Sequence, residues 1–506
     1  MEKQDKKPNI IAIIGAIVLL VLAVVGLSYA FFSAFINGGE TDTSVEGTGA
    51  NLSLVYTDGK SVITSSNIMP GWSATKTFTV TNNGEADTYY KLNISNITNE
   101  FVEGGLTFSI ASTDGGANKD ETPVGTEDRT ISSSISIGVG KTHTYTITAK
   151  YINLDKDQTP DLGKSFSYTI GIEAGQKPLP TFAETILANN EVKAPITTPG
   201  AAISTASEAL LASAEDDYGT SYYFRGAVTN NYVEFANKCW RIVRVGGDGS
   251  VKLILHNDNP TGAANPCDAA NNSASAAFAR YSGTTYKSAF NTNYNDNAYV
   301  GFKFGTVGSS TYEATHANTN NSTILTNLET WYTNNLKTYA DAIADTVWCN
   351  DKTNVTDTSY DPWSITPNGL GYGTNTTYYG AMQRLVSTSS SAGGTGPSLK
   401  CNGELSKITS KVGLITADEL AFAGYAWNIG NTTTYLQENA TDTWWWSLSP
   451  YFFNGYNACV WRVNGRDGRF GYNFVYNSYG VRPSISLKPF TNVTGEGTSD
   501  KPFVVD

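Results

Sequence analysis

The sequence predicts an α+β multidomain chain: an N-terminal transmembrane helix, a β-sandwich, and a larger C-terminal domain that mixes strands with helices. Three observations predict this class. Residues 10–27 are apolar and uncharged, residues from about 50 to 174 read as short alternating strands, and from about residue 203 strands and helical stretches alternate. The 506 residues suffice for about three domains.

The apolar run is long enough to cross a bilayer, because a spanning helix needs about 18 or more such residues. Three lysines precede it, Lys3, Lys6 and Lys7, so the N-terminus should stay cytoplasmic and the rest should lie outside. Ser28 and Ala30 are small residues at the positions that a signal peptidase requires, and a cut after Ala30 would free the chain. Retention as an anchor is favoured, because the run is longer than the hydrophobic region of a usual signal peptide.

The sandwich is predicted from strands of period two. Residues 76–81 alternate, and residues 82–84 (NNG) supply a turn. The same alternation recurs in residues 90–94, 106–110, 143–147 and 166–170. Several such strands over one stretch are typical of a β-sandwich.

The C-terminal part combines a hairpin with helices. Residues 239–245 and 250–255 flank a glycine-rich turn and predict a hairpin. Residues 208–211 are expected in a short helical stretch, and residues 322 to about 348 in a longer helix with apolar side chains near 3.6-residue spacing. Residues 416–419 (TADE) form a capping box that opens a short helix, which Gly424 ends.

Composition excludes some functions. The net charge of −12 gives no electrostatic reason to bind nucleic acid. The three histidines, His143, His256 and His316, stand in no metal-ligand spacing, and no nucleophile with a base and no phosphate loop is found. We therefore predict no enzyme, no metal and no cofactor. The 29 tyrosines and 10 tryptophans suit a recognition surface or, equally, a Tyr-rich β fold.

The five cysteines suggest two disulfides, although spacing alone cannot assign connectivity. The first candidate is Cys349 with Cys401, which flank one long excursion, and the second is Cys239 with Cys267. Cys459 is then left over. No C-x-x-C motif supports a metal cluster.

Residues 444–488 read as hairpin-like and carry the candidate binding surface. The flanks, 444–450 (WWWSLSP) and 480–488, are interpreted as core, with Arg482 pinning a loop. Between them, Tyr, Phe, Arg and Asn alternate with small residues, which is typical of a binding surface that combines rigid aromatics with adaptable polar groups. The predicted ligand-binding residues are Tyr451, Phe453, Tyr456, Cys459, Arg462, Arg466, Arg469, Tyr472, Phe474, Tyr476 and Tyr479.

Two family resemblances follow from motifs. Residues 28–33 (SYAFFS), 69–71 (MPG) and 78–84 (FTVTNNG) resemble the camelysin and biofilm-matrix fibre protein family of Gram-positive bacteria. This resemblance covers about a quarter of the chain and implies a sandwich, with fibre formation in some members. The chain has no H-E-x-x-H motif that would support the protease activity attached to camelysins.

The C-terminal region resembles the variable proteins of diversity-generating retroelements and related surface proteins of gut Firmicutes. The matching motifs are residues 221–226, 230–233, 240–244, 294–300, 413–419, 444–450 and 480–483. The resemblance implies a C-type-lectin-like fold whose C-terminal segment is rewritten at template adenines. Calcium-dependent sugar binding is not implied, since neither Glu-Pro-Asn nor Trp-Asn-Asp occurs. Formylglycine-generating enzymes share the fold, but their cysteine pair is not matched here.

Together these patterns predict a surface-displayed ligand-binding protein, adhesin- or receptor-like, in the bacterial cytoplasmic membrane with its C-terminus outside, or secreted if cut. The expected partner is a protein or glycan on a host cell, bacterium or phage. Alternatives are a structural subunit of an extracellular fibre or, with less support, an enzyme. The expected segments are a basic tail (1–8), the transmembrane or signal-anchor helix (9–32), a linker (33–48), the sandwich (49–174), a linker (175–202), the lectin-like domain (203–490) and a tail (491–506).

Overall fold

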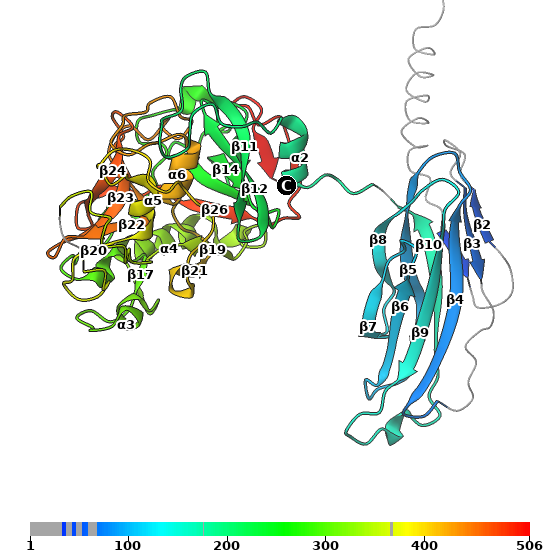
Figure 1. Cartoon of the computed structure of the whole chain (residues 1–506). Coiled ribbons are helices and arrows are strands. Elements are labelled where there is room, and N and C mark those ends of the chain that lie inside the picture. The colour runs from blue at the N-terminus through cyan, green and yellow to red at the C-terminus, as the bar shows by residue number, and fades with distance from the viewer. Residues whose placement is uncertain are drawn as a thin grey trace, which may run out of the picture. The chain divides into compact units, whose positions relative to one another are not determined.

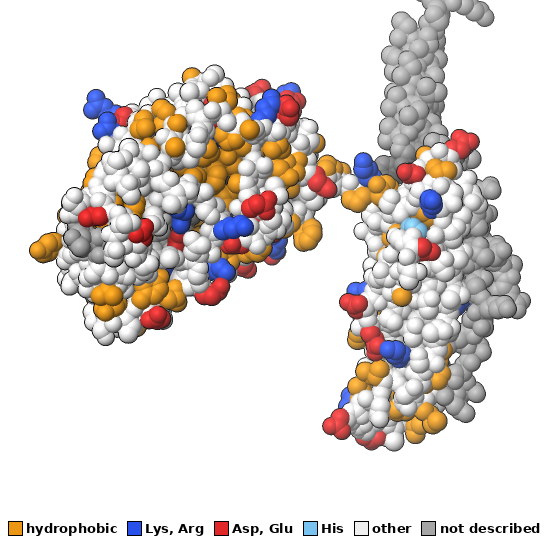
Figure 2. All heavy atoms as spheres, viewed as in Figure 1, with side chains coloured by type: hydrophobic (Ala, Val, Ile, Leu, Met, Phe, Trp, Pro, Cys, Tyr) orange, Lys and Arg blue, Asp and Glu red, His pale blue; other side chains and the backbone are white. Residues whose placement is uncertain are grey.

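The computed structural model describes residues 33–36, 43–46, 53–58, 68–175, 177–364 and 368–505. The chain divides into two compact units, Met1–Leu179 and Pro180–Asp506 (Figure 1). Figure 2 shows the side chains on the surface of each unit by type, with charged groups scattered among polar and hydrophobic ones.

Two antiparallel sheets build the first unit. One has the order β1 (Ser33–Ile36), β10 (Phe166–Ala174), β5 (Thr88–Asn99), β8 (Arg129–Ile137). The other has the order β2 (Thr43–Glu46), β3 (Ser53–Asp58), β4 (Trp72–Asn82), β9 (Thr142–Tyr151), β6 (Leu106–Ser112), β7 (Lys119–Pro123). A single 3₁₀ turn is described in this unit, at Thr159–Asp161.

Alternation along the strands of this unit places its core. β4 and β9 pair in continuous register from Trp72↔Tyr151 to Thr81↔Thr142. Phe78 and Val80 of β4 are buried, while the alternating threonines Thr77, Thr79 and Thr81 are more exposed, as a pleat of period two requires. These side chains join apolar residues of β5 and β10 in one cluster, so the two sheets enclose a common core.

The second unit contains a large mixed sheet. Its order is β11 (Ala209–Asp216), β12 (Gly219–Gly226), β14 (Lys238–Val245), β13 (Tyr232–Phe235), β28 (Phe503–Val505), β27 (Val493–Thr494). β15 (Val251–Asn257) also pairs β14, and β26 (Ser484–Leu487) pairs β15.

A second sheet carries the C-terminal hairpins. Its order is β16 (Lys287–Ser288), β25 (Tyr479–Gly480), β22 (Trp445–Phe453), β23 (Ala458–Val463), β24 (Phe470–Phe474), with β20 (Thr377–Tyr378) on β22. Two small pairs complete the sheets, β17 (Lys303–Phe304) with β18 (Asn320–Asn321) and β19 (Thr346–Cys349) with β21 (Lys407–Ser410).

Helices in this unit are short. They are α2 (Phe182–Asn189), α3 (Tyr312–His316), α4 (Thr323–Asn335), α5 (Gly380–Leu385) and α6 (Ala417–Ala423). Four 3₁₀ turns accompany them, at Ala269–Asn271, Asn297–Val300, Lys337–Tyr339 and Glu404–Ser406. One large core joins both sheets and the helices, and α5 and α6 lie against β22.

The α+β class predicted from the sequence is therefore wrong. The described chain is mostly β-sheet, organised in several sheets, with few helices. Residues 208–211 illustrate the error, because β11 pairs β12 without interruption from Ala209↔Gly226 to Asp216↔Gly219. Tertiary pairing overrides the helical preference of Ala and Leu. The long helix expected for residues 322–348 ends at Asn335 and is followed by the strand β19.

The predicted membrane anchoring is also corrected. No helix in the described part of the chain is both long and apolar enough to cross a membrane. The helix predicted for residues 9–32, and the signal-peptidase site at Ala30, lie outside the described residues. The structure therefore gives no support to the predicted location in the cytoplasmic membrane with the C-terminus outside.

Segments predicted as linkers and tail carry structure. Strands β1 and β2 fall within the expected linker 33–48. In the expected linker 175–202, α2 is capped by Thr181 and buries Phe182 against Phe503, with ring centroids 5.2 Å apart. Phe503 belongs to β28 in the expected tail, so the C-terminus lies beside α2 (Figure 1). Sequence periodicity misses such short elements because their partners are distant in the chain.

Candidate ligand-binding surface

Three consecutive strands, β22, β23 and β24, position the residues predicted to bind a ligand. β22 pairs β23 from Trp445↔Val463 to Phe453↔Ala458, with two register shifts between. β23 pairs β24 from Cys459↔Phe474 to Val463↔Phe470. Residues directly opposite each other share a face of the sheet, and β24 is the edge strand.

Part of the predicted surface belongs to the core. The buried members are Tyr451, Phe453, Cys459 and Arg462. The Tyr451 ring lies 4.8 Å from Trp461 and stacks 4.4 Å from Tyr472, measured between ring centroids. Every residue of β22 and β23 is buried, so these strands are covered on both faces and have no solvent side. Tyr451, Phe453 and Cys459, predicted as members of an exposed binding surface, are therefore buried in the sheet.

Exposed aromatic side chains gather where β22 turns into β23. Tyr456 in this turn is 79% exposed, and Tyr476, just after β24, is 40% exposed. The backbone carbonyl of Tyr294 accepts a hydrogen bond of 2.7 Å from Ala458 N–H. The centroids of the Tyr294 and Tyr476 rings lie 4.8 Å apart. Tyr476 also stacks on Phe474 at 5.6 Å. We call Tyr294, Tyr456, Phe474 and Tyr476 the aromatic end of the hairpin.

A cluster of one cation and two aromatic rings, formed by Arg462, Trp444 and Tyr479, lies further along the strands. The guanidinium carbon of Arg462 lies 3.8 Å from the ring centroid of Trp444, and Tyr479 lies 5.2 Å from the same ring. Asn473 donates a 2.7 Å hydrogen bond to the Tyr479 hydroxyl. Arg462 donates from Nη1 to the carbonyl of Arg469 at 2.9 Å, while its buried Nε has no partner among the described atoms.

Arg462 has no ion pair within the described part of the chain. Burial lowers its pKa to about 10, because desolvation disfavours the charged form. Arginine still stays protonated at neutral pH, so a positive charge is held beside Trp444 without a carboxylate. Arg462, predicted as part of the exposed surface, is therefore buried, and its guanidinium lies over the Trp444 ring.

The turn between β23 and β24, at the opposite end of these strands, carries two exposed arginines. Arg469 makes a long contact of 3.9 Å with Asp467, and its side chain is half exposed. Arg466 is exposed, and its guanidinium has no hydrogen bond or ion pair among the described residues. Tyr472 and Tyr479 are half-buried. The structure thus divides the predicted set between a core and two exposed ends of the three-stranded segment β22 to β24. One end is the β22–β23 turn and the other is the β23–β24 turn.

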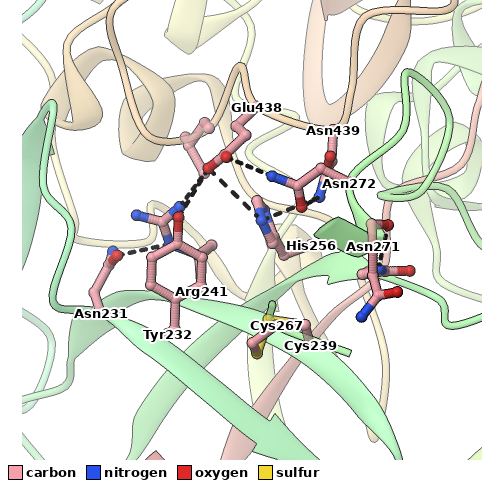
Figure 3. Close-up of polar contacts among 12 residues, drawn as sticks. Asn231, Tyr232, Cys239, Arg241, His256, Cys267, Asn271, Asn272, Glu438 and Asn439 are labelled. Carbon is pink, nitrogen blue, oxygen red and sulfur yellow. Dashed lines mark hydrogen bonds and ion pairs between the residues drawn. A yellow bond between two sulfur atoms is a disulfide. The ribbon is translucent and has the colours of Figure 1, made fainter. Parts of the chain in front are cut away.

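A second polar constellation, drawn in Figure 3, includes Tyr232, Arg241 and Glu438, which line the same hollow as Arg466. The buried Arg241 donates to Glu438 at 3.2 Å and holds its guanidinium 3.7 Å from the centre of the Tyr232 ring. The Tyr232 hydroxyl donates to the same carboxylate at 2.9 Å. The amide of Asn439 lies 3.1 Å from Nε2 of His256 and acts as its donor, since burial lowers the pKa of this histidine well below its usual value and keeps it neutral.

Both candidate disulfides are formed. Cys239–Cys267 bridges the strand β14 to the loop after β15, close to the constellation of Figure 3. Cys349–Cys401 closes the excursion between β19 and the loop before β21. Cys459 is free and buried, and burial raises the pKa of its thiol well above the usual value. The sequence-based disulfide prediction is confirmed.

A buried charge network lies near the second disulfide. Glu419 accepts from Lys252 at 2.6 Å and from Arg244 at 3.0 Å. Burial alone would raise the pKa of Glu419, but the two cations lower it to about 2. Arg384 bridges Asp351 and Asp418, each at 2.7 Å. These groups satisfy one another inside a cavity of about 40 Å³, so we interpret them as structural.

The part of the chain that the structure describes offers no site for binding a metal ion or for catalysis by histidine. No group of three or more His, Cys, Asp or Glu side chains could hold a metal ion there. His143, His256 and His316 are all buried and lie apart. Their environments are those of packing residues.

Sequence reasoning missed several residues of these sites. Tyr294 was placed only in a family motif, although a tyrosine followed by Asn-Asp-Asn signals an exposed loop. Arg241 and Tyr232 read as ordinary strand residues, and Glu438 stands in an uninformative loop. Only the folded chain brings β13, β14 and the loop 432–441 together.

One family model matches this chain, over residues 312–489, and its description is a domain of unknown function (DUF6273). The matched range contains α3 to α6 and β22 to β26, and hence the three strands that carry the candidate surface. It omits β11 to β15, which also contribute buried side chains to the common core. No curated protein matches the chain. The match therefore does not indicate a function.

Proposed function

We propose that the second unit is a ligand-binding domain and that the aromatic end of the hairpin, with the adjoining cluster of Trp444, Arg462 and Tyr479, is its binding surface. The observation that carries the proposal is the exposed stack of Tyr294, Tyr476 and Phe474. Tyrosines that offer a large rigid area together with a polar hydroxyl are the residues that dominate binding hot spots. The expected partner is a protein or glycan.

The support beneath the stack favours the proposal. Tyr451, Trp461 and Tyr472, one from each of the three strands, form an aromatic cluster in which Tyr451 stacks on Tyr472 and meets Trp461 edge-on. A surface fixed by such packing loses little conformational entropy when a partner binds. Tyr456 and Tyr476 project from this rigid base, whereas scattered apolar side chains on flexible loops would not offer a defined surface.

The resemblance to retroelement variable proteins adds a sequence argument. Rewriting at template adenines is tolerated only where a new side chain does not disturb the core. Under this proposal variation falls on Tyr456, Arg466, Arg469 and Tyr476, which are exposed, and spares Tyr451. A near-copy of codons 444–483 in the neighbouring DNA that differs at adenines of the exposed codons would support diversification; differences in the core codons would count against it.

The binding proposal is tested by measuring where the labelled full-length chain binds. The probes are a glycan array and intact bacterial and epithelial cells, compared for the wild type and a variant with Tyr294, Tyr456 and Tyr476 changed to Ser. The matched control is Tyr218→Ser, an exposed tyrosine of the β11–β12 turn. We expect a target bound equally by wild type and control and at least about tenfold more weakly by the triple variant.

Two results would contradict the proposal. One is a target that the triple variant binds as well as the wild type does. The other is the absence of any target for the wild-type chain among glycans and cells.

A further inference from the structure

An open hollow of about 410 Å³ lies at the other end of the hairpin, away from the aromatic end. Its walls are the β12–β13 connection, the loop 432–441 and the side chain of Arg466. A hollow of this volume is in the range that holds small ligands. The constellation of Tyr232, Arg241 and Glu438 forms part of its lining (Figure 3).

The charges around this hollow are unequal. Among its lining residues the cations are Arg241 and Arg466 and the single anion is Glu438. Glu438 already pairs with Arg241, so the charge of Arg466 is not balanced. Arg482, buried nearby, adds another guanidinium that has no ion pair among the described residues and whose Nη2 has no partner. A positive hollow in a chain of net charge −12 indicates an anionic ligand.

Hydroxyl groups supply the rest of the recognition chemistry. Thr229, Thr432 and Thr441 are exposed members of the lining, and none of their hydroxyls bonds elsewhere in the described chain. Threonine hydroxyls both donate and accept, as the hydroxyls of a sugar do. The carboxylate of Glu438, whose side chain is 40% exposed, can accept further hydrogen bonds.

The carboxylate also discriminates among anions. Phosphate or sulfate would bring a compact, strongly charged group that Glu438 repels, and it would offer few donors in return. A sugar acid carries one negative charge at one end and donor hydroxyls at the other. Arg466 can hold its carboxylate through two parallel hydrogen bonds, while Glu438 and the threonines engage the hydroxyls.

We infer that the hollow between the loop 432–441 and Arg466 binds a carboxylate-bearing sugar unit. This site is separate from the aromatic end of the hairpin and does not depend on the function proposed for it. It assigns to Arg466 the role of carboxylate receptor and to Glu438 that of acceptor for a sugar hydroxyl.

Calorimetry with the purified full-length chain tests the inference, with glucuronic acid, glucose and inorganic phosphate as probes. We expect glucuronic acid to bind and glucose and phosphate to bind at least about tenfold more weakly, because each lacks one half of the recognition. Arg466→Ala should lower the glucuronate affinity by about tenfold or more. Arg469→Ala, an exposed arginine of the same hairpin outside the hollow, should leave it unchanged.

Arg466 has no side-chain partner among the described residues, so its replacement should not affect folding; equal melting temperatures of the two variants check this. The inference is overturned if glucuronate does not bind at tens of millimolar, if glucose or phosphate binds as tightly as glucuronate, or if the two arginine variants lose affinity alike. Loss of aromatic-end binding would not alter any of these readings.

Discussion

Replacing Tyr472 with alanine should destabilise the second unit much more than replacing Tyr476, although both tyrosines stand in the predicted binding stretch. The Tyr472 ring stacks 4.4 Å from Tyr451, meets Phe452 edge-on at 5.0 Å and lies parallel to Trp427 at 6.1 Å. Full burial of an aromatic ring is worth about 3–5 kcal/mol on truncation to alanine, and Tyr472 is half-buried. Allowing about half of that, plus about 0.5–1.5 kcal/mol for the best aromatic pair, gives a loss of about 3 kcal/mol.

Tyr476 is 40% exposed and touches only Tyr294 and Phe474 among the aromatic rings of the described residues, so its replacement should cost about 1 kcal/mol or less. Urea unfolding of the disulfide-intact chain, followed by tryptophan fluorescence, measures both free energies of unfolding; the unchanged slope with urea checks that the native state is comparable. Equal losses for the two variants would refute the division of this hairpin into a core face and an exposed end.

Two further predictions concern buried groups. Since the pKa of Glu419 is about 2 in the folded chain and about 4.5 in the unfolded chain, its contribution is present above pH 4.5 and disappears as the pH falls towards 2. The loss should be about 3 kcal/mol, and Glu419→Gln should flatten this part of the pH profile of unfolding; an unchanged profile would exclude the assignment. The buried Cys459 thiol should react with an aromatic disulfide reagent only after unfolding, and stoichiometric reaction of the native chain would contradict its burial.

Local patterns predicted local structure well. The hairpin of β14 and β15 was predicted because alternating strands flank a glycine-rich turn, and Val245 pairs Val251 across it. The capping box from Thr416 to Glu419 opens α6, where Glu419 N–H donates to the Thr416 hydroxyl at 3.0 Å. Gly424 ends this helix with a φ of 121°, which a residue without a Cβ adopts without strain.

Elements set by distant partners were not predictable in the same way. The alanine and leucines of residues 208–211 favour a helix in isolation, yet β12 is available as a pairing partner and the segment becomes the strand β11. Apolar side chains continue at helical spacing beyond residue 335, but Thr346 pairs Ser410 and starts β19. In both segments the hydrogen bonds of a ladder replace those of a helix.

Only part of the candidate surface was predicted, and one physical assumption explains why the rest was not. Reading alternate residues as exposed assumes that a strand has one solvent face. Every residue of β22 and β23 is buried, and α5 and α6 pack against β22, so Tyr451, Phe453 and Cys459 are buried whatever their parity along the strand. The predicted residues that do reach solvent, Tyr456, Arg466, Arg469 and Tyr476, stand outside the strands, in the turns that join them or just after β24.

The same burial explains how the three strands β22, β23 and β24 can carry two independent sites, one at each of their two turns. The aromatic cluster of Tyr451, Trp461 and Tyr472 packs the middle of β23 and β24, so the turn that bears Tyr456 and the turn that bears Arg466 are held apart by the length of the strands. A substitution in either turn alters solvent-facing chemistry without changing the packing between them. Binding at the aromatic end and at the hollow should therefore be separable by mutation, and a variant that abolished both would place its effect in the core.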